Sequence, residues 1–249
     1  MVGQDLRDFE IMKIMTKTVF TVGLLALLMS LPVFGASVNK SIRIEAGSES
    51  SGATSVNGSI SVGENAVVTG GVKTVNGAIR VAAGASIGTA STVNGSVGIS
   101  DNVRSLSLKT VNGSIKVGKT AAVDGKITTV NGSITVGDGS SVVQGISNVN
   151  GQIEISGAEV GGDVATVNGD VYVVEGAVIK GDLRVEKPSS RSKLLSRKPR
   201  LVIGPGSSVE GVIDLQREVE LFISDTATVG GVTGEMTLDD AVRFSGKRP

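Results

Sequence analysis

Carboxylates are the residues of this chain with the clearest potential for chemistry, because the sequence contains no histidine and no cysteine. It therefore lacks an imidazole base, a thiol nucleophile and the usual zinc ligands. Asp163 and Asp182 stand 19 positions apart, each after a glycine and before an aliphatic residue. In a chain that coils with this period the two carboxylates would stack, and could bind Ca²⁺ or act as an acid–base pair. We favour the simpler interpretation that both are exposed turn residues.

A regular polar array is the second candidate site. The tripeptide Val-Asn-Gly recurs, Thr or Ser precedes it in most copies, and Ser often follows it. One asparagine in every turn of a coil would form a ladder of amide hydrogen bonds, which is a structural role. In the functional alternative, Thr, Asn and Ser project on one face and present a hydroxyl array to ice or to a crystalline polysaccharide. The asparagines are Asn39, Asn57, Asn76, Asn94, Asn112, Asn131, Asn150 and Asn168.

A basic segment interrupts this pattern after Glu186. It contains two prolines and no acid, which indicates a loop inserted into one coil. Besides a solvated insertion, it could be a contact for an anionic surface such as lipid headgroups or an acidic glycan. It has no aromatic residue, so nothing supports base stacking and no nucleic-acid partner is expected. Its basic residues are Lys187, Arg191, Lys193, Arg197, Lys198 and Arg200.

The elements that position these groups follow from the spacing of the asparagines, which is 18 or 19 residues. A fixed period of about this length is typical of solenoids. Counted from each asparagine, positions +3 and +5 are always aliphatic and +4 is mostly polar, as in Ile134, Thr135 and Val136. This alternation indicates a strand with one buried face. We therefore predict an all-β fold, a single-stranded parallel β-helix with one coil per 18–19 residues.

The rest of each coil is predicted to form a second, looser strand. Its aliphatic residues stand near positions +11 and +15, as in Val142 and Ile146. Glycines separate the strands, and we expect them to supply left-handed corners, with Asn-Gly as one of these corners. The difference between 18 and 19 residues is expected to be absorbed at such a corner.

The chain divides into four parts. Residues 1–35 combine basic residues, an apolar run from Val19 to Leu31 and small residues before position 36, which is typical of a secretory signal peptide. This run is short for a membrane span, which needs about 20 apolar residues. Solenoid repeats over 36–185, a basic inserted loop over 186–200 and C-terminal coils with a cap over 201–249 follow. We expect an exported protein, periplasmic or at the cell surface, with no membrane span after cleavage.

The repeated motif Thr-Val-Asn-Gly-Ser-Ile-x-Val, found intact at 129–136, resembles that of the auto-transporter-type adhesin families of bacterial β-solenoids. The glycine-aliphatic coils, such as Val-Ile-Lys-Gly-Asp-Leu at 178–183, are similar to those of bactofilins, the polymer-forming cytoskeletal proteins. Both resemblances imply a β-solenoid, and neither supplies catalytic residues.

Together these patterns predict a non-catalytic, exported, structural or adhesin-like protein that self-assembles at the cell envelope. The alternative is a module that binds the envelope or a polysaccharide through the Thr/Asn/Ser face or the basic loop. The expected partners are further copies of the chain, an envelope polysaccharide or an anionic surface, and no cofactor or metal is expected. The formal net charge is zero, so bulk electrostatics favours no class of partner.

Overall fold

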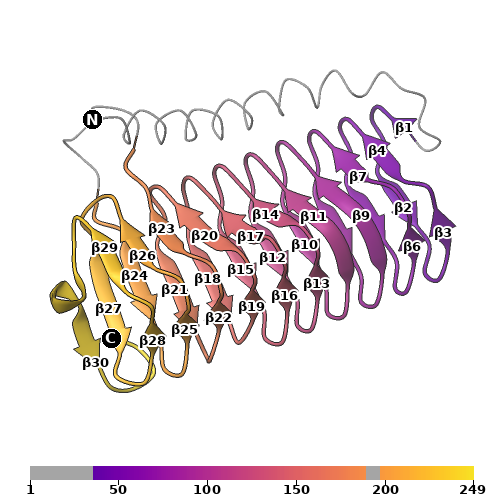
Figure 1. The fold of residues 1–249 in the computed structure, drawn as a ribbon. Coiled ribbons are helices and arrows are strands. Elements are labelled where there is room, and N and C mark those ends of the chain that lie inside the picture. The colour runs from indigo at the N-terminus through magenta and orange to yellow at the C-terminus, as the bar shows by residue number, and fades with distance from the viewer. Residues whose placement is uncertain (1–35, 189–196) are drawn as a thin grey trace.

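The computed structural model describes residues 36–188 and 197–249. They form an elongated parallel β-solenoid, in which strands of successive coils pair in parallel along the whole rod (Figure 1). The predicted fold class and coil length are confirmed. The predicted signal peptide lies outside the described residues, as do residues 189–196 of the inserted loop.

The first face of the rod, called face 1, is an 11-stranded sheet built from positions +3 to +5. Burial follows the predicted alternation, since Ile134 and Val136 are buried and Thr135 between them is not. Equivalent positions pair between coils, as Ile115 does with Ile134. The strands are β2 (Ile42–Ile44), β5 (Ile60–Val62), β8 (Ile79–Val81), β10 (Val97–Ile99), β12 (Ile115–Val117), β15 (Ile134–Val136), β18 (Ile153–Ser156), β21 (Val171–Val174), β24 (Arg200–Ile203), β27 (Glu220–Ser224) and β30 (Val242–Phe244).

The rest of most coils forms two short strands, which corrects the prediction of one looser strand. Val142 and Ile146 are both buried as predicted, but a turn separates them. Face 2 contains β3 (Glu49–Ser50), β6 (Val67–Val68), β13 (Ala122–Val123), β16 (Ser141–Val142), β19 (Glu159–Val160), β22 (Val178–Ile179), β25 (Ser208–Val209) and β28 (Thr228–Val229). Face 3 contains β4 (Ala53–Ser55), β7 (Val72–Thr74), β14 (Lys126–Thr128), β17 (Gly145–Ser147), β20 (Asp163–Thr166), β23 (Leu183–Val185), β26 (Ile213–Leu215) and β29 (Val232–Gly234), and β1 (Ala36–Ser37) pairs with β4.

The corner between faces 2 and 3, called the glycine corner, absorbs the extra residue of several longer coils. In β9 (Ser86–Ser91) and β11 (Arg104–Lys109) the two faces form one continuous strand. Ser105 pairs with Val123, and Leu108 pairs with Ile127. Two residues separate Ser105 from Leu108, whereas three separate Val123 from Ile127, so the coil that contains Val123 has one more residue at this corner. The prediction that a corner takes up the difference is therefore confirmed here.

The left-handed corner lies between faces 1 and 2. Backbone φ is positive there in coil after coil, as at Asn65 (55°), Gly84 (71°), Asn102 (58°) and Thr120 (51°). No asparagine of the Val-Asn-Gly series has a positive φ, and among its glycines only Gly151 has one (118°), so the prediction of a left-handed Asn-Gly corner is wrong for the other copies. The left-handed conformation instead occurs four or five residues after the first residue of most face 1 strands, as at Asn65 after Ile60.

The core consists of aliphatic columns that run the length of the rod. Stacking places like residues over one another, which buries faces that a single coil would leave in water.

Coils occur on both sides of the predicted inserted loop, because β23 ends at Val185 and β24 begins at Arg200. At the C-terminal end Met236 and Val232 pack partly buried against the core, next to a short 3-10 helix, Leu238–Asp240. Within the described residues no helix is long and apolar enough to span a membrane.

Candidate functional site

The asparagine corner joins face 3 of one coil to face 1 and carries the Val-Asn-Gly repeat. Each amide donates its Nδ2 hydrogen to Oδ1 of the asparagine one coil earlier, for example from Asn112 to Asn94 (2.9 Å) and from Asn131 to Asn112 (3.0 Å). All the donors and acceptors are exposed, so the ladder is an amide ridge on the surface. It runs without interruption through Asn39, Asn57, Asn76, Asn94, Asn112, Asn131, Asn150 and Asn168.

The Thr that precedes Val-Asn-Gly in five of its seven copies points into the rod. Thr110 is only 4% exposed, and its Oγ1 donates to the carbonyl oxygen of Gly95 at 2.8 Å. Thr129 and Gly113 form the same pair at 3.1 Å. The predicted outward face of Thr, Asn and Ser is therefore wrong, because the chain turns the corner between Thr and Asn. The hydroxyl array needed for ice or a crystalline polysaccharide does not form from these threonines.

The glycine of the motif is required by a close backbone approach. A Cβ placed on Gly113 would lie 2.0 Å from the carbonyl oxygen of Gly95, and one on Gly132 would lie 2.0 Å from that of Gly113. Real Cβ atoms do not come this close to an oxygen. The three positions thus act together, because Thr holds the glycine carbonyl of the coil before, Asn joins the amide ladder, and Gly lets the backbones approach.

Replacing Asn112 by alanine tests the ladder, since it removes the bonds to both Asn94 and Asn131. Each exposed hydrogen bond contributes about 1 kcal/mol or less, so we expect a loss of about 1–2 kcal/mol in the free energy of unfolding, measured by chemical denaturation. Gln144→Ala is the matched control, because this exposed amide makes no side-chain hydrogen bond among those of the described residues. Equal effects of the two substitutions would show that the ladder adds nothing to stability.

The ladder ends at Asn168, and charged residues replace it in the following coils. Arg217 donates from Nη1 to Oδ1 of Asn168 at 3.0 Å, which satisfies the last acceptor. The register of face 1 places Lys198 and Glu218 in the asparagine column, and they form an ion pair at 2.6 Å. Sequence reasoning missed both Arg217 and the ion pair beside it. The only available signal was that Lys198 and Glu218 carry opposite charges and stand 20 residues apart.

The flanks of the basic segment are bound to acids of neighbouring coils. Arg197 pairs with Asp170 at 2.6 Å, and Arg200 pairs with Glu220 at 3.0 Å. Lys187 reaches Glu235 at 3.1 Å, and Lys198 is paired within the asparagine column as described above. Arg191 and Lys193 lie outside the described residues. The contact of this segment with an anionic surface stays a prediction.

The two aspartates of interest lie one coil apart at the glycine corner. Oδ1 of Asp163 accepts the N–H of Asp182, and Oδ1 of Asp182 accepts the N–H of Val212, both at 3.0 Å. Arg184 bridges them, with Nη1 3.0 Å from Asp163 and Nη2 2.5 Å from Asp182. Their charge is thus compensated by a guanidinium and by backbone donors. Across residues 36–188 and 197–249 no group of three or more His, Cys, Asp or Glu residues is arranged to hold a metal ion.

This cluster predicts a loss of stability in acid. The hydrogen bonds from the Val212 N–H and from Arg184 hold the pKa of Asp182 below its ordinary value. The resulting stabilisation is fully present above the unfolded-state pKa of about 4 and is lost as the pH falls through the folded-state pKa. We expect Asp182→Asn to flatten the dependence of unfolding free energy on pH below about 4.

Glu186 provides the control with the opposite sign. Burial raises the pKa of Glu186, despite the neighbouring Arg184. Its contribution therefore favours the folded state at low pH and is lost as the pH rises above about 4. Glu186→Gln is expected to leave the loss of stability in acid unchanged and to alter the free energy of unfolding only above about pH 4. An Asp182→Asn variant that loses stability in acid as steeply as the parent would contradict the assignment.

These polar contacts join neighbouring coils. The amides of the ridge bond to one another, and the two aspartates bond to Arg184 and to backbone N–H groups, so the polar groups of the repeat hold coils in register. Comparisons of the chain with protein-family models, with curated proteins and with solved structures find no match.

Proposed function

We propose that this chain is a non-catalytic, exported structural protein, an adhesin-like β-helical rod that works at the cell envelope. The observation that carries the proposal is the unbroken amide ladder, which joins eight consecutive coils along one edge of the rod. Each coil touches only its neighbours in a solenoid, so the stiffness of the rod depends on such inter-coil bonds. The resemblance of the Thr-Val-Asn-Gly repeat to adhesin-type β-solenoids supports the same function.

Self-assembly is the second element of the proposal. Within the described residues, β2 pairs only with β5, and β3 pairs only with β6, so this end of the rod presents strand edges. Unpaired edges are templates for another strand. At the other end, β30 pairs only with β27, and Val242 in it is 54% exposed. We therefore propose that copies of the rod associate end to end.

Two measurements test the proposal. A C-terminally tagged form is expected outside the cytoplasm, with a mature N-terminus near residue 36 by N-terminal sequencing. The purified mature protein is expected to form filaments by electron microscopy. A tag that stays in the cytoplasm with an intact N-terminus would contradict export, and strictly monomeric sedimentation at high protein concentration would contradict assembly.

A further inference from the structure

The outward position of face 1 carries a row of cations in the N-terminal coils. Arg43, Arg80 and Lys116 occupy the middle of β2, β8 and β12, and register pairing places them in one line. Ser61 and Gly98 fill the same position in the coils between them. The basic row, as we call these three cations, therefore has one positive charge in every second coil, or about every 10 Å at the usual strand spacing.

The cations of the basic row are exposed and make no ion pair within the described part of the chain. They line a shallow groove of about 800 Å³, with Ser61 and Gly98 among its lining residues. A Cβ on Gly98 would meet no atom within 4 Å, so the space over this position is open. The groove thus alternates charged side chains with room for a ligand.

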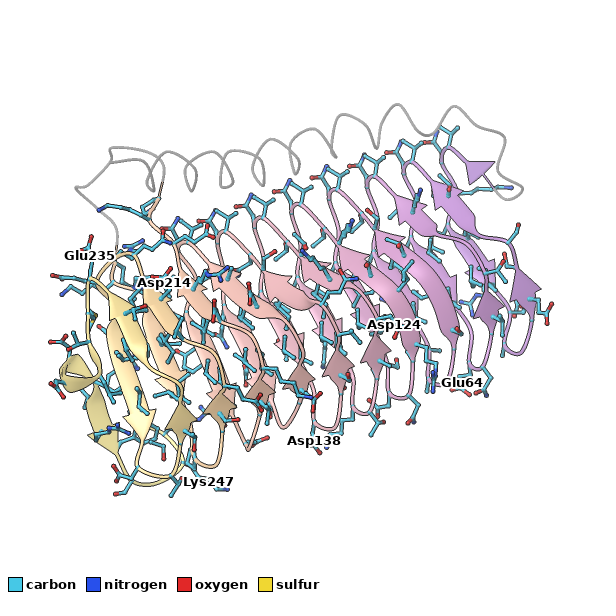
Figure 2. All side chains as sticks on the ribbon, in the orientation of Figure 1. Glu64, Asp124, Asp138, Asp214, Glu235 and Lys247 are labelled. Atoms are coloured by element: carbon cyan, nitrogen blue, oxygen red, sulfur yellow. The ribbon has the colours of Figure 1, made fainter. Side chains whose placement is uncertain are left out.

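Acids near the groove lie at its rim. Glu45 and Asp101 line the side next to the left-handed corner, and Oδ1 of Asp101 already accepts the N–H of Lys119 at 2.7 Å. Figure 2 shows Glu64 and Asp138 at the same edge of the rod, away from the middle of face 1. Along the row itself the outward residue stays basic or neutral from Arg43 through Thr135, before Glu154 ends the series.

We propose that the basic row binds a linear anionic polysaccharide that lies along the rod axis. The spacing fits an extended chain with one carboxylate or sulfate per disaccharide, which places an anion about every 10 Å, the distance of two coils. Two of the three cations are arginines, whose planar fork pairs with a carboxylate or a sulfate through two hydrogen bonds. The small residues between them leave space for the neutral sugar.

Other anionic partners fit this surface less well. The coils of the basic row carry no aromatic side chain, so they offer no platform on which nucleic-acid bases could stack. A lipid headgroup surface favours cations spread over a face that protrudes, whereas these three stand in a single file within a groove. The surface is also separate from the basic segment after Glu186, whose described cations are paired with acids.

The test measures binding of the purified protein to hyaluronate, which carries one carboxylate per disaccharide, by calorimetry, with dextran as the neutral polymer. Three charge contacts on a polyanion predict that the affinity falls roughly tenfold between about 50 and about 200 mM salt. The variant Arg43→Gln, Arg80→Gln, Lys116→Gln is expected to lose at least roughly tenfold in affinity at low salt. The control variant Lys73→Gln, Arg104→Gln, Lys126→Gln removes the same charge from faces 2 and 3 and is expected to bind like the parent.

Circular dichroism and thermal melting establish that both triple variants are folded before binding is compared. Equal losses in the two variants would overturn the proposal, because net charge and not the row would then control affinity. Failure of the parent protein to bind hyaluronate at low salt would overturn it as well. So would tighter binding to single-stranded DNA or to vesicles of anionic lipid, which would assign the row to another class of partner.

Discussion

Replacing Gly113 by alanine is expected to destabilise the protein by about 3 kcal/mol, the upper part of the usual range for overpacking. The new methyl group would lie 2.0 Å from the carbonyl oxygen of Gly95. That oxygen cannot move freely, because it accepts the hydroxyl of buried Thr110 at 2.8 Å. The backbone of one coil must shift away from its neighbour. This shift strains the adjoining hydrogen bond between the side-chain amides of Asn94 and Asn112. A fall of roughly 10 °C in Tm follows from the size of the chain.

Gly98→Ala is the matched control for this effect. Gly98 lies in β10, in the outward position of face 1, and a Cβ there meets no atom within 4 Å. We expect a change within about 0.5 kcal/mol, as for most substitutions of exposed residues. Both variants are compared by thermal melting and by chemical denaturation. If Gly113→Ala and Gly98→Ala had equal effects on stability, the close approach of Gly113 to the carbonyl oxygen of Gly95 would not explain why glycine occupies this position.

The period and the inward columns of face 1 could be predicted because they depend on a local rule. Ile134 and Val136 flank the polar Thr135, the same alternation recurs in most copies of the motif, and it suits a strand with one buried face. The positions of Val142 and Ile146 in the core could be predicted for the same reason. The sharp turn between them could not, because three intervening residues fit either an irregular strand or a corner.

The direction of Thr110 was predicted wrongly for a physical reason. Thr110 and Asn112 are two positions apart, a spacing that puts side chains on one face only while the strand continues. The strand of face 3 ends at this point, and the turn sends the threonine inward and the asparagine outward. The contacts of Arg217 and Arg197 lie beyond sequence reasoning, since the inserted loop breaks the period and their partners are 49 and 27 residues away.

The second large effect is expected at Ile134 in the middle of the rod. This side chain is fully buried, and its neighbours in the column are Ile115 and Ile153. Truncation to alanine removes core contacts and leaves a cavity, which costs about 2–5 kcal/mol. Thr135→Ala on the outer side of the same strand is the local control, and it is expected to change the free energy of unfolding by no more than about 0.5 kcal/mol.

Where the cavity lies decides how the protein unfolds. In a solenoid each coil is stabilised by its nearest neighbours, so a weak central coil uncouples the two halves of the rod. Ile134→Ala is therefore expected to unfold in two steps, with amide hydrogen exchange becoming fast in one half before the other. Ile60→Ala, in an equally buried position near the N-terminal end, is expected to weaken only the terminal coils and to leave the main transition single. A single unfolding transition in both variants, with an unchanged dependence of the unfolding free energy on denaturant concentration, would contradict this. It would require coupling that reaches well beyond adjacent coils.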